Sequence, residues 1–494
     1  MIRNPVLPGF HPDPSIVRVG DDYYLATSSF EWYPGVRVHH SRDLVHWRPL
    51  GGILTERRLL DLSGVPDSGG VWAPDLTYHD GLFHLVYGVM DNYALGYKDV
   101  ANHLITAPSI EGPWSDPVRL PGRGFDASLY HEDGRSWLLS MVFDSRPGRG
   151  FAGIEMRSLD GGKPELILPD REVTEGPHLY RIGGWYYLMV AEGGTGYQHQ
   201  VTVLRSRSMS GPFEEDPAGP MLTSRHDPGL ELQKAGHGCL VETQTGEWYL
   251  AHLAARPYHN RACVLGRETA IQRVVWEDGW PRVAGGVPAV EVAPPALPAC
   301  PWPADEDSGG IDGGLGARWS TLRRPASPDW VVAARDGLTI KGGQSPYGLR
   351  SPSLVARPVT ARTCSLEAVV RFEPDGVHQS AGITAYYNSR NWHYLALTSD
   401  GLVLTTSDRG TRTEHLLGPA GPEARLRVEL DGPVVRFNHG PELDATILSD
   451  EHADERVDGH IRSFGFTGAF VGLWVQDLAG EGGTARFEQI RYTA

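Results

Sequence analysis

The sequence predicts an all-β protein in which a five-bladed β-propeller, over residues 1–289, is followed by a β-sandwich of jelly-roll type over residues 306–494. Three observations lead to this prediction. A segment with a polar first residue recurs five times in the first part of the chain, a proline-rich linker over residues 290–305 interrupts the pattern, and strands of alternating polarity fill the remainder. The 60 Gly and 38 Pro residues are spread throughout, as in proteins built from short strands and tight turns.

Each repeat contains a polar residue, a short apolar strand, a turn and an aromatic-rich strand. The repeats begin at Asp13, Asp75, Asp126, Glu175 and His237, at intervals of 49 to 62 residues. A period of about 50 to 60 residues with several strands in each unit is typical of propeller blades. A long β-sandwich is the alternative, but a sandwich does not need a repeat with a fixed polar start.

The first residues of the five repeats are expected to meet at one end of a central channel. The innermost strand of every propeller blade faces that channel, so residues that begin these strands converge in space. A single aspartate before a strand is most often a turn cap. Four carboxyl groups in one place are electrostatically costly and perturb one another's pKa values, which favours a functional site.

The chain changes character after the last repeat. The stretch VPAVEVAPPALPACPWPADEDSGG reads as a linker that passes over the surface. Segments of alternating polarity then follow, among them SLEAVVRF, GITAYY, HYLALTS, LVLTTS and RLRVEL. Their period of two predicts a β-sandwich. A carbohydrate-binding module, a structural brace and an oligomer contact are three open roles for this domain.

Composition excludes several classes of partner. The formal net charge of −16, with no basic run to offset it, argues against nucleic acid. The start MIRNPVLPGF lacks the pattern of a signal peptide, and no apolar run approaches the ~18 residues of a membrane span. We therefore expect a cytoplasmic protein that contacts no membrane. Reduced core residues are expected at the four widely separated cysteines, Cys239, Cys263, Cys300 and Cys364.

A cluster of carboxyl groups suits hydrolysis of a glycosidic bond. That reaction needs one protonated carboxyl group to assist the leaving oxygen and one ionised carboxylate to attack or to activate water. Neighbouring carboxyl groups can hold these two different protonation states, because the negative charge of one raises the pKa of the other. Binding of a divalent metal ion is the rival use of such a cluster. No G-x-S-x-G motif or phosphate-binding loop is present.

Several motifs resemble glycoside hydrolase family 43, and most closely its two-domain β-xylosidases. They run through most of residues 4–285 in the order FHPDPSIV, SSFEWYPGV, SGGVWAPDLTY, GFDASLY, TEGPHLY, AEGGTGY, HDPG, KAGHGCLVET, EWYLAHL and LGRETAIQRVVWEDGWP. Each motif alone is weak, whereas their number and order are specific. The resemblance implies a five-bladed propeller, a C-terminal β-sandwich and hydrolysis with inversion at the anomeric carbon.

The resemblance assigns three catalytic carboxyl groups. Asp13 matches the general base that activates water, Glu175 the general acid, and Asp126 the carboxylate that raises the pKa of the acid and orients it. Inversion requires room for a water molecule, so we expect roughly 6.5–9.5 Å between the carboxyl groups of Asp13 and Glu175. Pro12 and Pro14 would fix the direction of the base.

Further positions match the sugar pocket of the family. Arg267 matches an arginine near the sugar hydroxyls, His237 a channel histidine and Thr195 a threonine of the pocket. The aromatic walls are matched by Phe30, Trp72, Phe125 and Phe143. Phe143 stands where relatives carry Trp, which could loosen the pocket. A phenylalanine from FGFTGAFVGLWVQD is expected to close it, with Phe470 as first candidate and Phe466 as alternative. Asp75 is Cys or His in some relatives, so its role is open.

The activity implied is release of xylose from the non-reducing end of β-1,4-xylo-oligosaccharides by an exo-acting, inverting enzyme. An α-L-arabinofuranosidase, or an enzyme with both activities, is the first alternative, and a non-catalytic sugar-binding propeller is the second. No cofactor is required by this chemistry, although some family members hold a structural calcium ion beside the histidine that matches His237. Family members of this type are commonly dimers or tetramers, so a homo-oligomer is expected.

Overall fold

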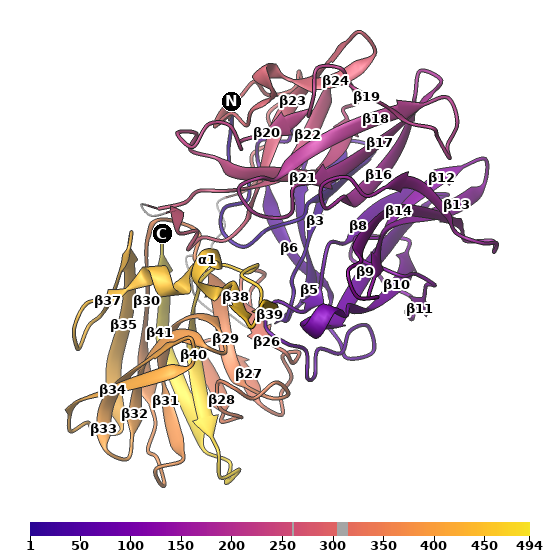
Figure 1. Cartoon of the computed structure of the whole chain (residues 1–494). Helices are drawn as coiled ribbons and strands as arrows, with labels where there is room; N and C mark the ends of the chain where they lie inside the picture. The colour runs from indigo at the N-terminus through magenta and orange to yellow at the C-terminus, as the bar shows by residue number, and fades with distance from the viewer. Residues whose placement is uncertain (259–260, 304–314) are drawn as a thin grey trace.

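The computed structural model describes residues 1–258, 261–303 and 315–494. The predicted all-β fold is confirmed, with a five-bladed propeller followed by a β-sandwich (Figure 1). Each blade is an antiparallel sheet. The innermost strand of each blade packs against the innermost strands of the neighbouring blades, and together these strands surround the channel. The repeats of the sequence therefore correspond to the blades.

The blades follow one another along the chain. Blade 1 contains β2 (Ser15–Val19), β3 (Asp22–Thr27), β5 (Gly35–Ser41) and β6 (Arg48–Leu54). Blade 2 contains β7 (Gly70–Val71), β8 (Asp75–His79), β9 (Leu82–Asn92), β10 (Asp99–Ala107) and β11 (Val118–Arg119), with the 3-10 turn η1 (Ala94–Gly96) after β9. Blade 3 contains β12 (Ser128–Glu132), β13 (Arg135–Asp144), β14 (Gly150–Ser158) and β15 (Glu165–Pro169). Blade 4 contains β16 (Glu175–Ile182), β17 (Trp185–Glu192), β18 (Gln200–Ser206), β19 (Glu214–Glu215) and β20 (Leu222–Thr223). Blade 5 contains β21 (Gln233–Glu242), β22 (Trp248–Ala255), β23 (Glu268–Glu277) and β24 (Trp280–Val283), followed by η3 (Ala284–Gly286).

The N-terminal segment ties the first blade to the last. Strand β1 (Ile2–Arg3) pairs with β25 (Glu291–Val292), beyond blade 5. The Asn4 side chain then donates to the carbonyls of Ile271 and Ala289 and accepts from the Ile271 amide. The amide of His11 donates to the carbonyl of Arg267. The FHPDP motif is thus held against blade 5 immediately before it enters blade 1.

Two antiparallel sheets form the sandwich. In the order of pairing, the first contains β34 (Thr411–Gly418), β33 (Gly401–Asp408), β32 (Asn391–Thr398), β31 (Gln379–Asn388), β40 (Phe470–Asp477), β29 (Ser353–Pro358), β26 (Ser320–Leu322) and β4 (Trp32–Tyr33). The second contains β27 (Val331–Ala334), β28 (Gly337–Lys341), β41 (Thr484–Thr493), β30 (Thr363–Arg371), β35 (Glu423–Asp431), β36 (Val434–Phe437) and β37 (Leu443–Asp444). Between β37 and β40 the chain forms η4 (Ala445–Leu448), α1 (Asp450–Ala453) and the hairpin β38 (Glu455–Val457) and β39 (His460–Ser463).

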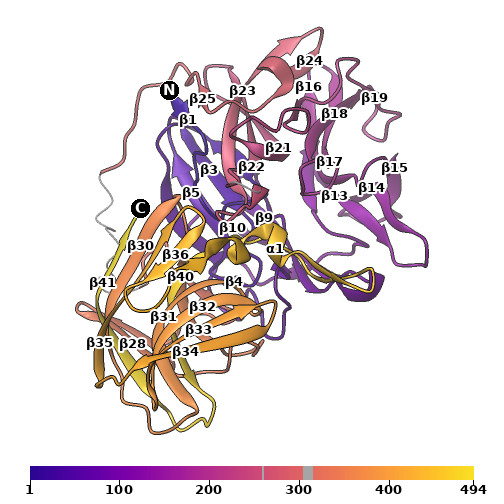
Figure 2. The ribbon, with the colours of Figure 1, turned by 60° about the vertical axis from the view of Figure 1, so that its left-hand side comes forward.

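The two domains share a sheet and a hydrophobic core. Strand β4 belongs to the propeller part of the sequence, yet it pairs with β26 at the edge of a sandwich sheet. The ring of Trp32 stacks on Phe470, with 4.0 Å between ring centroids, and both side chains are buried. Figure 2 shows the segment after α1 extending from the sandwich along the propeller. The sandwich is therefore part of the framework that surrounds the end of the channel.

The linker packs against blade 1 where it is described. The indole of Trp302 donates to the carbonyl of His46, and its ring lies 4.0 Å from the guanidinium carbon of Arg48. The predicted linker and sandwich boundaries, at residues 305 and 306, lie outside the described residues.

The expectation of reduced cysteines agrees with the structure. All four are free, and three of them are buried core residues, whereas Cys300 in the linker is partly exposed, so the prediction of a core position is wrong for it. Among the described residues there is no helix long and apolar enough to cross a membrane.

Replacing Trp32 by alanine is expected to destabilise both domains together. The change empties the space between Phe470 and Tyr386, whose ring lies 5.9 Å from Trp32, at a cost of roughly 3–5 kcal/mol. Calorimetry should then show a lower Tm, or two transitions in place of one. Trp248→Ala removes a half-buried ring of blade 5 and is the control. An equal loss of stability in both variants would contradict a special role for the shared sheet.

Candidate active site

A cavity of about 440 Å³ lies at the end of the channel where four of the five repeats begin. Asp13, Asp126, Glu175 and His237 all line it. Asp75 does not. These four side chains come from four blades, so the convergence that the repeat predicts is found for every blade except the second.

Left-handed backbone conformations accompany the residues that line the cavity. Asp13, Asp126 and His237 have φ values of 54°, 53° and 47°, and Glu175 is followed by Gly176 at 56°. Such angles are strained for residues other than glycine and are frequent at functional sites. A side chain on Gly176 would also approach the His237 ring to about 3.0 Å. The glycine of the TEGPHLY motif therefore allows blades 4 and 5 to come together.

Asp75 is hydrogen-bonded to residues of the two neighbouring blades. Its carboxylate accepts hydrogen bonds from the Ser15 hydroxyl, at 3.0 Å, and from the Leu129 amide, at 2.8 Å. These contacts connect blade 2 to blades 1 and 3. Asp75 is thus a buried link between blades, and the expectation that it joins the cluster of carboxyl groups is wrong.

Three cationic or polar groups hold Asp13 in its ionised form. Arg267 Nη1 donates to Asp13 Oδ1 at 2.9 Å, Ser28 Oγ donates to Oδ2 at 2.6 Å, and His237 Nδ1 lies 3.8 Å from Oδ1. Burial alone would raise the pKa of Asp13, but Arg267 and then His237 and Ser28 outweigh it, so the pKa is lowered. Asp13 is therefore a carboxylate that stays charged inside the protein.

The surroundings of Glu175 favour its protonated form, in contrast to those of Asp13. Burial and then the charge of Asp13 raise its pKa to about 8, although Arg267 and Lys98 act against the shift. Asp126 also has its pKa raised, by burial, by Glu175 and by Asp13. The carboxylate of Asp126 accepts from the Gly176 amide at 3.2 Å, which fixes the backbone next to Glu175. Of the three carboxyl groups in the cavity, Asp13 thus has a lowered pKa, whereas Glu175 and Asp126 have raised pKa values.

The predicted aromatic walls surround these groups. Trp72 and Phe125 meet edge to face with centroids 4.9 Å apart, and Phe143 and Phe151 do so at 5.8 Å. The remaining predicted pocket residues that line the same cavity are Phe30, Thr195 and Arg267. Ring faces and polar edges of this kind are suited to a sugar.

Phe470 is the one predicted pocket residue that lies elsewhere. Its ring is fully buried against Trp32 and Phe10 in the core between the domains, because Phe470 begins strand β40. The alternative, Phe466, lines the cavity and lies 5.7 Å from the Phe30 ring. Its carbonyl accepts from Arg267 Nη2 at 3.4 Å. The prediction of Phe470 is therefore corrected to Phe466.

Lys98 lines the cavity and was not suggested by any motif. Its ammonium group lies 4.6 Å from the centroid of Phe464 and 5.4 Å from that of Trp72. Burial lowers its pKa to about 8, and the charge of Glu175 acts against this shift. A lone lysine in GYKDV carries no signal in the sequence, because its aromatic neighbours come from distant segments.

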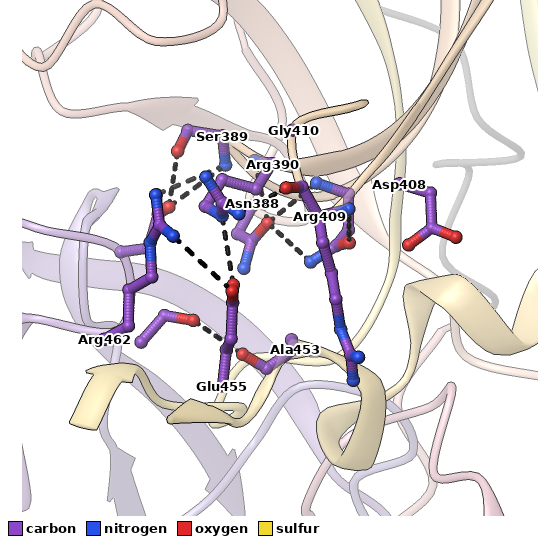
Figure 3. Close-up of polar contacts among 12 residues, drawn as sticks. Asn388, Ser389, Arg390, Asp408, Arg409, Gly410, Ala453, Glu455 and Arg462 are labelled. Carbon is purple, nitrogen blue, oxygen red and sulfur yellow. Dashed lines mark hydrogen bonds and ion pairs between the residues drawn. The ribbon is translucent and has the colours of Figure 1, made fainter. Parts of the chain in front are cut away.

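The β38–β39 hairpin supplies the other unexpected part of the wall. The side chains that it and its flanks contribute are Asp454, Arg456, His460, Ile461 and Phe464. Figure 3 shows its anchor, where the carboxylate of Glu455 lies between two arginines, 3.2 Å from Arg390 Nε and 3.6 Å from Arg462 Nη1. The Ser463 hydroxyl also donates to the carbonyl of Ala453. The sandwich thus holds the hairpin firmly against the mouth of the cavity.

The surroundings of His237 do not fit a metal site made by side chains. Burial lowers the pKa of His237 to about 4, so the ring is neutral and available as a ligand. However, the described part of the chain brings together no group of three or more His, Cys, Asp and Glu side chains that could hold an ion. The calcium ion that the resemblance implies beside His237 stays a prediction.

Comparisons with protein families match both domains. The model of glycosyl hydrolases family 43 matches residues 2–281. The model of the β-xylosidase C-terminal concanavalin A-like domain matches residues 312–493. The two matches correspond to the propeller and to the sandwich.

Known proteins resemble the chain over its full length. Xylosidase/arabinosidase 43B of Humicola insolens is 42% identical, covering 99% of this chain and 97% of that protein. A β-xylosidase of Bacillus subtilis (strain 168) is 41% identical, covering 99% of each. The crystal structure of a xylan β-1,4-xylosidase from Bacillus halodurans C-125 covers 100% of both chains with a TM-score of 0.94 and 43% identity.

Replacing Arg267 by methionine is expected to move both limbs of the pH–rate profile to higher pH. The guanidinium lowers the pKa of Asp13 and of Glu175, so its removal raises both values. The ionised form of Asp13 is then lost at a higher pH on the acidic side, and the protonated form of Glu175 survives to a higher pH on the alkaline side. The profile of kcat/KM for a glycoside substrate measures this.

Arg282→Met is the control for this measurement, because Arg282 pairs with Asp216 outside the cavity. The control is expected to leave the profile unchanged. A profile of the Arg267 variant that keeps both limbs in place would contradict the electrostatic account of the two carboxyl groups.

Proposed function

Because the chain belongs to glycosyl hydrolases family 43, we propose that it is an inverting, exo-acting β-xylosidase that releases xylose from the non-reducing end of β-1,4-xylo-oligosaccharides. The observation that carries the proposal is the convergence of Asp13, Asp126 and Glu175 on one cavity, in which the surroundings lower the pKa of Asp13 and raise that of Glu175. Hydrolysis with inversion needs a general base and a general acid at the same time. The names of the relatives support the substrate class.

In this mechanism Asp13 accepts a proton from water while the water oxygen forms a bond to the anomeric carbon. The bond between that carbon and the leaving oxygen breaks, its electron pair stays on the oxygen, and Glu175 donates a proton to it. The reaction leaves Asp13 protonated and Glu175 ionised, and exchange with solvent restores both. The separation expected between these carboxyl groups, roughly 6.5–9.5 Å, stays a prediction.

Asp126 and Arg267 serve the two reacting carboxyl groups. The Asp126 carboxyl group accepts a hydrogen bond from the Gly176 amide, and this contact orients the acid. The expectation that Asp126 raises the pKa of Glu175 stays a prediction. Arg267 keeps Asp13 ionised through their contact at 2.9 Å. No cofactor takes part in these steps.

The closed wall supports an exo action. Phe466 and the β38–β39 hairpin come from the sandwich and lie on the cavity beside Phe30, Trp72 and Phe464. A cavity of about 440 Å³ with such a wall admits the end of a short chain and excludes the middle of a long one. The substrate partner is thus a short oligosaccharide. The dimer or tetramer and the cytoplasmic location stay predictions.

An α-L-arabinofuranosidase activity, alone or beside the first, is the second candidate. Humicola insolens 43B carries both activities in its name, at 42% identity. Xylopyranose and arabinofuranose present similar hydroxyl patterns to one pocket. Phe143, which lines the cavity, is the residue expected to influence the preference.

The proposal is tested by hydrolysis of xylobiose, 4-nitrophenyl β-D-xylopyranoside and 4-nitrophenyl α-L-arabinofuranoside side by side. We expect rapid release of xylose from xylobiose. Hydrolysis of the arabinoside with none of xylobiose would overturn the xylosidase and favour the second candidate. Unchanged activity in both Asp13→Asn and Glu175→Gln would instead show that neither carboxyl group acts as proposed.

Glu175→Gln is expected to lose much more activity on xylobiose than on an aryl xyloside. A sugar leaving group needs a proton, which is worth roughly 10²–10⁴ in rate, whereas a nitrophenolate departs without full protonation. Asp13→Asn is the matched comparison, since loss of the base slows both substrates alike. The ratio of kcat/KM for the two substrates in each variant is the measurement. Equal losses on both substrates in Glu175→Gln would contradict its role as acid.

A further inference from the structure

Ser68 uses all its polar groups at the border between the two domains. It is buried, with 1% of its surface exposed, and has a left-handed φ of 56°. Its amide donates to Glu31 Oε2 at 3.1 Å, and its carbonyl accepts from the Trp72 indole at 2.9 Å. Its hydroxyl donates to the carbonyl of Phe464 at 2.8 Å and accepts from the amide of Phe466 at 3.3 Å.

The three aromatic residues that Ser68 binds form one wall of the cavity. Phe464 and Phe466 stack with centroids 4.5 Å apart, and Trp72 meets Phe466 edge to face at 5.8 Å. Trp72 belongs to the propeller, whereas the two phenylalanines come from the sandwich, almost 400 residues later. Ser68 is therefore the point at which the two halves of this wall are joined by hydrogen bonds.

A buried ionic cluster fixes the position of Ser68 itself. Arg323, at the end of β26, donates to the carbonyl of Val65 at 2.8 Å and to the carboxylate of Asp67 at 2.7 Å. The Arg323 amide also donates to the carbonyl of Glu31 at 2.8 Å. The residues on the N-terminal side of Ser68 and its partner Glu31 are thus all bound to one arginine of the sandwich.

We propose that Ser68 is a positioning residue for the sugar site, whose hydroxyl sets the spacing between Trp72 and the Phe464–Phe466 pair. It does not touch the substrate. It acts by holding the Phe464–Phe466 pair in contact with Trp72, so that the three rings keep their places in the cavity wall. The inference rests on the proposed function, because it assumes that the cavity binds a glycoside. A purely structural role, in which the hydroxyl only strengthens the domain interface, is the alternative.

The test compares Ser68→Gly and Ser68→Ala with Ser320→Ala. Glycine adopts a φ of 56° without strain, so Ser68→Gly removes the hydroxyl and relaxes the backbone at the same time. Ser320 is the matched control, since its buried hydroxyl accepts a hydrogen bond from the Arg37 guanidinium across the same interface, and neither residue lines the cavity or contacts Asp67. The assay uses whichever glycoside the wild-type enzyme hydrolyses, with xylose or arabinose as the matching product inhibitor.

We expect both Ser68 variants to raise KM and the inhibition constant of the sugar by roughly 3- to 10-fold, as the loss of a hydrogen bond predicts, with a smaller change in kcat. Ser320→Ala is expected to lower Tm without changing KM. Hydrogen exchange should also show faster exchange of the Phe466 amide in the Ser68 variants and not in the control.

Three results would overturn the inference. The first is KM values like those of the wild type in both Ser68 variants. The second is an equal rise of KM in Ser320→Ala. The third is a rise of KM in Ser68→Gly alone, which would assign the effect to the backbone. The activity of the wild-type enzyme tests the proposed function. The ratio of KM in a variant to KM in the wild type tests the positioning role of Ser68. The exchange rate of the Phe466 amide tests whether the Ser68 hydroxyl holds this segment in place, whichever glycoside the enzyme hydrolyses.

Discussion

The buried contact between Arg267 and Asp13 is the interaction on which the chemistry of the site depends. Asp13 is 5% exposed, and without a cation beside it burial would favour its protonated form. Burial raises the pKa of Glu175, and the negative charge of Asp13 raises it further. The ion pair with Arg267 thus keeps Asp13 ionised as the base, and the charge of Asp13 helps to keep Glu175 protonated as the acid. The two carboxyl groups receive opposite states because Arg267 lies in direct contact with only one of them.

The fold brings these groups together by repetition. Each blade begins with a residue at the end of the channel, and left-handed turns aim Asp13, Asp126 and His237 into the cavity. The sandwich completes the enclosure, since β4 and β26 pair across the domains and the hairpin of β38 and β39 covers the mouth. The wall of the cavity is therefore made by residues of both domains.

Much of this arrangement could be predicted from the sequence, because a repeat with a polar start fixes both the propeller and the end of its channel. Asp75 departs from the pattern because its carboxylate is bound by Ser15 and Leu129. The sequence does not separate Phe466 from Phe470, because it does not show that the strand begins only at Phe470. Lys98 and Ser68 carry no local signal, since their partners lie in segments that only the folded chain brings close.

The central claim, that Glu175 is protonated beside an ionised Asp13 at neutral pH, is tested most directly by infrared difference spectroscopy. The spectrum of the wild-type protein minus that of Glu175→Gln should contain the carbonyl stretch of a protonated carboxyl group at pH 7. That band should fade as the pH rises through about 8, the pKa of Glu175. A difference spectrum with only carboxylate bands at pH 7 would show that Glu175 is ionised and would contradict the account.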